Sequence, residues 1–172
     1  VKDVMMDLLK IPYDKDNAAH KRWLDWAVKL NKKYPAVLEE YGKVNCPMNP
    51  YAFLDLFFQE ASEDEVMVCG NGSACVMTFQ ACRIKEGQRL FTNSGCAAMG
   101  YGFPAAIGAA IARKGKQVVC IDGDGSFQMN LQELQTVVYN RLNIKIIYLN
   151  NDGYNEIIYD LEELNTTRKE II

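Results

Sequence analysis

The chain of 172 residues has the length of one domain and a globular composition, with 49% hydrophobic and 24% charged residues. These values exclude a disordered, collagen-like or coiled-coil chain. Its 19 basic and 22 acidic residues give a net charge of −3, so no basic surplus favours nucleic-acid binding. No apolar run reaches the roughly 20 residues of a membrane span, and we expect no membrane contact.

The six cysteines are interpreted as small buried hydrophobic residues in a reducing compartment, which predicts a cytoplasmic location. None forms a C-x-x-C pair, and several lie in apolar runs, as Cys120 does in the run 118–121. The single histidine, His20, lies in a stretch with the pattern of an exposed helix. A zinc site of clustered His and Cys ligands is therefore disfavoured.

The first 47 residues differ from the rest and are interpreted as a connecting segment that packs on something else. Apolar residues at Trp23, Leu30 and Tyr34 recur with helical period, which predicts a helix over 18–34 with basic residues on its other face. A further helix is predicted over 51–60, before an acidic loop.

From residue 66 onward, short apolar strands alternate with helices. The strands are predicted at 66–69, 89–91, 117–122 and 144–149, and the helices at 73–83, 104–113, 130–140 and from near Tyr154. Continuous apolar strands that alternate with helices are typical of an α/β fold, a parallel sheet with helices on both faces. The turns that follow the strands, at 70–72, 93–95, 123–125 and 150–153, should therefore meet at one edge.

Asp124 lies between two glycines at the end of a predicted strand, just before a helix. A carboxylate beside a helix N-terminus that favours an anion is unfavourable unless a cation lies between them. Mg²⁺ fits this place because it takes hard oxygen ligands from protein, phosphate and water. Asn150 and Asn151 end the next strand, and Gly153 adds a backbone carbonyl. Together these groups predict a site for a metal-bound diphosphate.

The Gly-Asp-Gly at 123–125, the Asn-Asn at 150–151 and the 24 residues between them resemble the signature of thiamine diphosphate (ThDP) enzymes. The segments NSGCAAMGYGFPAAIGAAIA (93–112) and IDGDGSFQMNLQEL (121–134) resemble the C-terminal, diphosphate-binding domain of the acetolactate synthase group. The similarity covers about residues 49–157. It implies that residues 1–47 are a linker from a missing central domain. Residues 48–172 would be the diphosphate-binding domain, truncated at its C-terminus.

The resemblance implies Mg²⁺ ligands at the Asp124 carboxylate, the Asn151 side chain and the Gly153 carbonyl. It implies cofactor-binding roles for Asn71, Gly72, Ser73, Ala97, Met99, Gly123, Gly125, Ser126 and Tyr154. Met99 is the implied catalytic residue, since the matching residue wedges between the two cofactor rings and keeps them bent. The Ala97 carbonyl and the Met99 N–H would bind the aminopyrimidine.

The activity implied by the resemblance is the decarboxylation of a 2-keto acid such as pyruvate, followed by carboligation of the remaining fragment to a second carbonyl. The glutamate that such enzymes need lies in the pyrimidine-binding domain, normally of a second subunit. We therefore expect this transferase or lyase to be a homodimer or larger, and this chain to be inactive alone. A flavin (FAD) would bind the central domain and stays open.

Two departures leave alternatives open. The loop 70–73 and the run 150–155 differ from the usual acetolactate synthase pattern, so a simple 2-keto acid decarboxylase is one alternative. A cofactor-binding module without catalysis is another, because the activating glutamate is not in this chain. Residues 70–75 imitate the G-x-G-x-x-G of nicotinamide dehydrogenases, but Cys75 replaces the third glycine and no acidic residue falls near 90–92.

Overall fold

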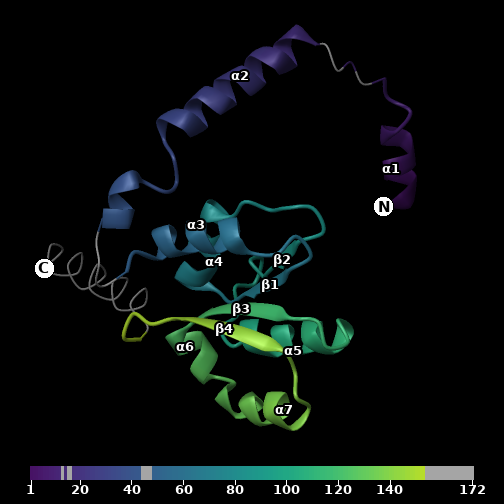
Figure 1. The fold of residues 1–172 in the computed structure, drawn as a ribbon. Helices are drawn as coiled ribbons and strands as arrows, with labels where there is room; N and C mark the ends of the chain where they lie inside the picture. Colours follow the sequence, from purple (N-terminus) through teal and green to yellow (C-terminus); the bar gives the residue numbers. More distant parts are fainter. Residues whose placement is uncertain (13, 15–16, 44–47, 154–172) are drawn as a thin grey trace, which may run out of the picture. The chain divides into compact units, whose positions relative to one another are not determined.

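The computed structural model describes residues 1–12, 14, 17–43 and 48–153, and the chain divides into two compact units, 1–36 and 37–172. Unit 1 contains helices α1 (Lys2–Leu8) and α2 (Ala18–Lys33) (Figure 1). α2 begins after Asn17, whose side chain accepts hydrogen bonds from two N–H groups of the first turn. The predicted helix over 18–34 is confirmed, and α1 is an additional helix. The division of the sequence at residue 47 stays a prediction.

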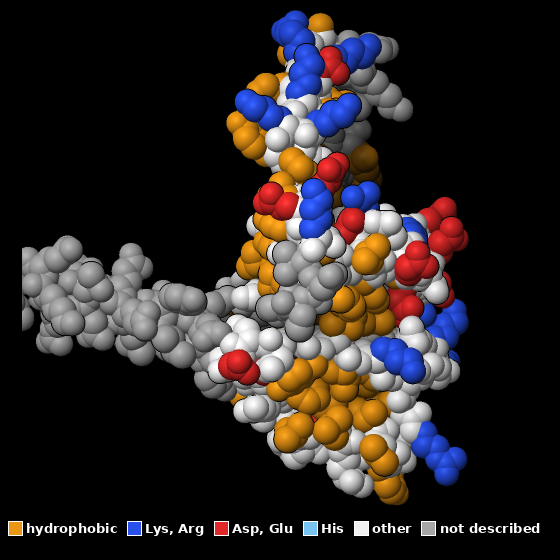
Figure 2. Space-filling model, turned by 60° about the vertical axis from the view of Figure 1, so that its left-hand side comes forward, with side chains coloured by type: hydrophobic (Ala, Val, Ile, Leu, Met, Phe, Trp, Pro, Cys, Tyr) orange, Lys and Arg blue, Asp and Glu red, His pale blue; other side chains and the backbone are white. Residues whose placement is uncertain are grey.

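No side chain of α2 is buried within the structure. Its Trp23 and Trp26 are 68% and 56% exposed, and His20 is exposed as predicted. Figure 2 shows hydrophobic side chains beside Lys and Arg side chains at the top of the view, where this helix lies. The packing of this segment on another body stays a prediction.

Unit 2 is built on a four-stranded, all-parallel sheet in the order β2-β1-β3-β4. Its strands are β1 (Val66–Cys69), β2 (Arg89–Phe91), β3 (Val118–Gly123) and β4 (Ile144–Leu149). The register pairs Cys69 with Ile121 and Gly123 with Leu149, so the carboxyl ends of β1, β3 and β4 lie side by side. The parallel sheet is confirmed, with β3 shifted by one residue from its predicted range.

Helices cover both faces of this sheet, which confirms the predicted α/β class (Figure 1). On one face lie α3 (Pro50–Glu60) and α4 (Gly72–Ala81), and on the other lie α5 (Gly102–Ala112), α6 (Asp124–Gln128) and α7 (Leu134–Tyr139). Short 3₁₀ helices are η1 (Glu39–Lys43) and η2 (Leu131–Glu133). The single helix predicted over 130–140 is wrong in detail, because η2 and α7 share that range. The helix predicted from Tyr154 lies outside the described residues.

Alternate residues of the central strands face the two helix layers. Val68 and Cys120 pack in one cluster with Phe103 of α5, and Cys69 and Ile121 pack in a second cluster with Phe58 of α3. All six side chains are fully buried. This alternation explains why both faces of the central strands are apolar in the sequence.

The interpretation of the cysteines holds for the two buried in the sheet. Burial raises the pKa of the Cys69 thiol to about 12 and also raises the pKa of Cys120, so both remain protonated. Cys96 is instead exposed, because it lies in the loop between β2 and α5. The five described cysteines are free thiols, and Cys46 lies outside the described residues. None of the described helices is long and apolar enough to cross a bilayer.

Candidate functional site

The chain leaves β1 and β3 in opposite directions across the sheet. β1 continues through α4 to β2 at one edge, whereas β3 continues through α6 and α7 to β4 at the other. Because β1 and β3 are neighbours, their carboxyl ends bound the crevice at which open α/β sheets bind ligands. A cavity of about 740 Å³ lies here, lined by residues that follow β1, β3 and β4.

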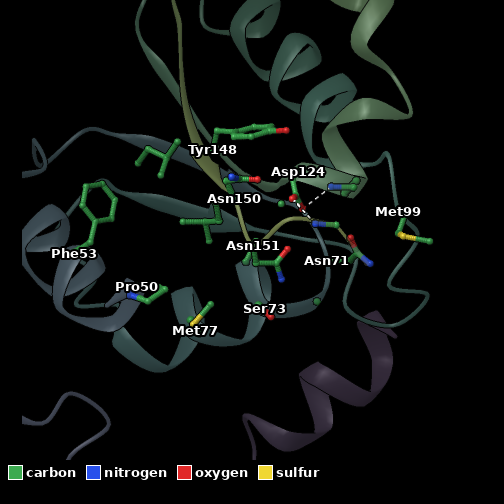
Figure 3. Close-up of a pocket in the computed structure, with 18 of the residues that line it drawn as sticks. Pro50, Phe53, Asn71, Ser73, Met77, Met99, Asp124, Tyr148, Asn150 and Asn151 are labelled. Atoms are coloured by element: carbon green, nitrogen blue, oxygen red, sulfur yellow. Dashed lines mark hydrogen bonds between the residues drawn. The ribbon is translucent and has the colours of Figure 1, made fainter. Parts of the chain in front are cut away.

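Most of the predicted site residues line this cavity. They are Asn71, Gly72, Ser73, Met99, Gly123, Asp124, Gly125, Ser126, Asn151 and Gly153. Ala97 lies in the same loop as Met99 without lining the cavity, and Tyr154 lies outside the described residues. Figure 3 shows Asp124, Asn151 and Asn71 close together at one end of the cavity.

The other end of the cavity has an apolar wall that the sequence did not predict. Pro50 and Phe53 of α3 and Met77 of α4 lie there (Figure 3). Ile147 and Leu149 of β4 add further apolar lining to the cavity. In the sequence these residues have the patterns of an amphipathic helix and a buried strand, which do not show whether a side chain faces a core or a cavity. The cavity therefore combines a polar end with an apolar one, the usual character of a small-molecule site.

Asp124 is the first residue of α6 and is only 5% exposed. Two backbone groups orient its carboxylate, because the Gly125 N–H donates to Oδ1 and the Gly153 N–H donates to Oδ2, both at 2.8 Å. Gly153 has φ +119°, a conformation that glycine adopts readily and other residues rarely do. The bond to Gly153 thus holds the loop after β4 against the loop after β3.

The side-chain amide of Asn151 lies between two oxygens of this site. One of its terminal atoms is 3.1 Å from Asp124 Oδ1 and 2.7 Å from the Gly153 carbonyl oxygen. When the amide nitrogen takes this place, it donates hydrogen bonds to both oxygens. When the amide oxygen takes this place, it lies within hydrogen-bond distance of Asp124 Oδ1 and of the Gly153 carbonyl oxygen. No proton then lies between these three oxygens. Only in this second orientation could the three oxygens bind a hard cation, which would take the place of the two hydrogen bonds.

Asp124 is the acidic side chain of this oxygen set. Among the residues that the structure describes, no group of three or more His, Cys, Asp or Glu side chains could hold a metal ion. A single carboxylate with neutral oxygens suits Mg²⁺, which usually takes one or two carboxylates together with phosphate and water.

Across the cavity, α4 begins at Gly72 after its N-cap residue Asn71. The Asn71 side chain does not cap the helix, and Gly72 has φ +57°. The first turn of a helix presents N–H groups that favour an anion. The polar end of the cavity thus has oxygens on one side and the start of a ten-residue helix on the other.

Met99 lies in the loop between β2 and α5 and is 38% exposed. The next residue, Gly100, is held from both sides. Its N–H donates to the Ser126 hydroxyl oxygen at 2.9 Å, and its carbonyl accepts from the Asn130 side-chain amide at 2.7 Å. The Ser126 hydroxyl, which the resemblance assigns to the diphosphate, therefore contacts the loop that carries Met99. Nothing in the sequence indicated the contact of Asn130.

Asp122 is a second buried carboxyl at this edge, but it does not line the cavity. It lies against Gly70 after β1 and Gly102 at the start of α5. Burial raises the pKa of Asp122, while hydrogen bonds from the Ser126 hydroxyl and the Gly123 N–H lower it in part. Its position indicates a structural role in joining β1, β3 and α5 beneath the cavity.

Residues 70–169 of this chain match the family described as thiamine pyrophosphate enzyme, C-terminal TPP binding domain. Thiamine pyrophosphate (TPP) is another name for ThDP. The match begins at the turn after β1 and includes the loops after β2, β3 and β4. It therefore covers every predicted site residue.

The chain is also similar to curated acetolactate synthases. It is 30% identical over 153 residues to acetolactate synthase isozyme 1 large subunit of Escherichia coli (strain K12), across 89% of this chain and 26% of that protein. It is 35% identical over 155 residues to the acetolactate synthase large subunit of Cyanidium caldarium, across 88% of this chain and 26% of that protein. With acetolactate synthase 2, chloroplastic, of Brassica napus, it shares 36% identity over 130 residues, 74% of this chain and 20% of that protein.

The chain thus spans between 20% and 26% of the length of these three relatives. The family match and these similarities agree with the parallel sheet and with the cavity at the carboxyl ends of its strands. The chain belongs to the thiamine pyrophosphate enzymes, as a C-terminal TPP-binding domain like that of the acetolactate synthase large subunits.

Proposed function

We propose that the chain binds ThDP through Mg²⁺ and supplies the diphosphate-binding part of an acetolactate synthase-like active site. The observation that carries this proposal is the meeting of Asp124 Oδ1, the Asn151 amide and the Gly153 carbonyl opposite the start of α4. Octahedral Mg²⁺ with ligands at about 2.0–2.1 Å places neighbouring ligands about 2.9 Å apart. The separations of 3.1 and 2.7 Å at Asn151, which are hydrogen-bond distances when the amide nitrogen takes this place, match that spacing when the amide oxygen takes it.

In this proposal Asp124, Asn151 and Gly153 each provide one oxygen to the metal. The diphosphate would lie between Gly125 and Ser126 on the β3 side and Asn71, Gly72 and Ser73 on the β1 side. The Gly153 N–H keeps the Asp124 carboxylate oriented toward the metal. The chain thereby neutralises and fixes the charged end of the cofactor.

The loop after β2 would orient the cofactor rings. The Ala97 carbonyl and the Met99 N–H would bind the aminopyrimidine, and the Met99 side chain would separate the two rings. When bound, ThDP supplies a nucleophilic carbon and an electron sink for decarboxylation of a 2-keto acid. The flexible thioether of Met99 suits contact with two rings.

The reaction of the whole protein is part of the same proposal. It would decarboxylate a 2-keto acid such as pyruvate and transfer the fragment to a second carbonyl, as a transferase or lyase. A pyrimidine-binding domain of a second subunit would complete the site in a homodimer or larger assembly. A location in the cytoplasm stays a prediction, and among the relatives the protein from Brassica napus is named chloroplastic.

Calorimetric titration tests the binding proposal. We expect saturable binding of ThDP in the presence of Mg²⁺ and its loss when EDTA removes the metal. Asp124→Asn should weaken this binding more than about tenfold, since changes at residues that merely support metal ligands already cost 10- to 100-fold.

The matched control is Asp25→Asn, which neutralises an exposed carboxylate of α2 and should leave binding unchanged. Binding of NAD instead of ThDP would support the nicotinamide alternative and contradict the proposal. Equal ThDP affinity in Asp124→Asn and in the unsubstituted protein would contradict the assignment of Asp124.

A further inference from the structure

Resting on the proposed function, we propose that Asn130 and Ser126 are positioning residues that tie the loop carrying Met99 to the metal-binding segment that starts at Asp124. They do so by holding the backbone of Gly100 from both sides, an arrangement that we name the Gly100 clasp. It comprises the bond from the Gly100 N–H to Ser126 Oγ and the bond from Asn130 Nδ2 to the Gly100 carbonyl.

Both clasp residues belong to the segment that begins at Asp124. Ser126 lies in the first turn of α6, is buried, and follows Asp124 by two positions. Asn130 follows α6, and its N–H donates to the Phe127 carbonyl at 3.2 Å. The ring of Phe127 packs 4.7 Å from that of Phe103 in the core. The segment from Asp124 to Asn130 is therefore held in place by the core and can act as a fixed support.

Asn130 has the position of a helix cap but does not cap its helix. It is the N-cap residue of η2, where asparagine normally accepts a hydrogen bond from an N–H of its own first turn. No such bond forms, and the side-chain amide donates instead to Gly100, thirty residues earlier in the chain. Aspartate caps helices equally well but could not donate this bond. The amide donor is thus used for a tertiary contact.

Gly100 is shaped for this contact. It has φ +80°, and a Cβ added to it would lie 2.6 Å from Asn130 Nδ2 and 3.2 Å from Met129 Cβ. The absence of a side chain lets Asn130 reach the carbonyl directly. The N–H held by Ser126 belongs to the peptide group that joins Met99 to Gly100. The clasp therefore fixes the backbone beside Met99 relative to Asp124.

This coupling predicts separate effects on the two ends of the cofactor. A diphosphate bound near Asp124 does not need the Met99 loop, whereas the rings of ThDP do. Loss of the clasp should therefore weaken binding of ThDP and spare binding of inorganic diphosphate. A residue that merely stabilised the fold would affect both ligands alike.

The test measures the affinity of the complete encoded protein for ThDP and for inorganic diphosphate, each with Mg²⁺, by calorimetry. The unsubstituted protein should bind ThDP more tightly than inorganic diphosphate. Asn130→Ala and the volume-conserving Asn130→Leu should weaken ThDP binding about five- to tenfold, the worth of one hydrogen bond. In both variants the affinity for inorganic diphosphate should change by less than about twofold, which is a smaller change than the loss of one hydrogen bond causes.

Asn140→Ala is the matched control. Its side-chain amide also donates to a backbone carbonyl at 2.8 Å, that of Thr136, but within the exposed surface of α7. Its loss should change neither affinity. An equal loss of affinity for both ligands in the Asn130 variants, or an unchanged affinity for ThDP, would overturn the role of the clasp. Neither result would contradict the proposed function. If the unsubstituted protein binds neither ligand, the proposed function itself fails.

Hydrogen exchange of the unsubstituted protein gives a second measurement that needs no variant. Binding of Mg²⁺ and inorganic diphosphate at Asp124 should slow exchange of the backbone amides at 99–101, because the clasp connects them to the bound segment. Unchanged exchange at these amides, with diphosphate bound, overturns the inference even if the Asn130 variants do not fold.

Discussion

Two glycines leave the space that the buried carboxyl of Asp122 occupies. A Cβ on Gly70 would overlap this carboxyl, and a Cβ on Gly102 would lie 2.6 Å from its Oδ2. The Thr92 hydroxyl also donates to the Gly70 carbonyl at 3.0 Å, so the turn after β1 has little room to move. The turn before Asn71 therefore requires a residue without a side chain at position 70.

Gly70→Ala should lower the free energy of unfolding by about 1–3 kcal/mol or more, because the added methyl group must displace the packed Asp122 carboxyl. Urea unfolding followed by circular dichroism measures this change. The matched control is Gly108→Ala in the interior of α5, where an added Cβ meets nothing within 4 Å. This control should gain up to about 1 kcal/mol from helix propensity. Equal stability of the Gly70→Ala variant and the unsubstituted protein would contradict the packing described.

Asp64 provides a prediction on pH. The Lys116 ammonium donates a hydrogen bond to Asp64 Oδ2 at 2.8 Å. This contact, and more weakly the charge of Arg113, hold the pKa of the exposed Asp64 carboxyl below its ordinary value. The pair thus stabilises the fold above the ordinary pKa of aspartate, and this contribution is lost as the pH falls through the lowered value. Lys116→Ala should raise the pKa of Asp64, as carboxyl NMR titration would show.

Lys10→Ala is the control for this titration, since Lys10 forms an exposed pair of the same length with Asp7. It should leave the pKa of Asp64 unchanged. High salt should reproduce part of the effect of Lys116→Ala by screening the exposed pair. A pKa of Asp64 that is insensitive to both Lys116→Ala and salt would refute this explanation.

At the scale of elements, the sheet was predictable and α6 was not. β1 and β3 are continuous apolar runs because both of their faces are covered, and such runs are visible in a sequence. α6 is five residues long and begins with Asp-Gly-Ser, too short for a helical period. It forms because Phe127 packs against Phe103 and Tyr148.

The candidate site divides in the same way. The residues proposed to bind the metal follow strands whose ends could be predicted, so Asp124 and Asn151 could be expected to lie close together. The apolar wall of the cavity could not be predicted, because the period of α3 does not show whether the face that carries Phe53 packs on a core or lines a cavity. The contact between Asn130 and Gly100 joins two loops that are distant in sequence, and no local pattern encodes it.

Phe103 shows how α5 supports the site. Its ring is fully buried between α5 and the sheet, next to Phe127 of α6. Phe103→Ala should lower the free energy of unfolding by about 3–5 kcal/mol through lost burial and the cavity that it leaves. Val138→Ala, on the exposed face of α7, should change it by less than about 0.5 kcal/mol. Comparable losses in the two variants, measured by chemical unfolding, would contradict the assignment of the core.

At the scale of the whole molecule, the chain matches the C-terminal TPP-binding domain of its family. It spans about a fifth to a quarter of the length of its relatives. The cavity at the strand ends contains groups suited to the diphosphate, the metal and the cofactor rings. The resemblance implies a glutamate that activates the pyrimidine ring, and no glutamate is among the residues proposed for this site. Under the proposed function we therefore expect turnover to require a second domain.

We predict that the 172-residue chain binds ThDP with Mg²⁺ but releases no CO₂ from pyruvate. Addition of a pyrimidine-binding domain that carries the activating glutamate should restore release, and a Glu-to-Gln variant of that domain should not. Radiometric CO₂ assay measures the outcome. Decarboxylation by the chain alone would overturn this division of labour. Binding without turnover in any combination would favour a non-catalytic module.

Both tryptophans of the chain, Trp23 and Trp26, lie on α2, and each exposes more than half of its surface. Their fluorescence therefore reports directly on unit 1. Unit 2 contains no tryptophan, so its unfolding is followed by tyrosine emission or far-ultraviolet circular dichroism. A shift of the tryptophan emission to shorter wavelength on assembly would mean that α2 had left water for a protein surface. The two rings thus give the segment before residue 37 a built-in optical label that needs no engineering.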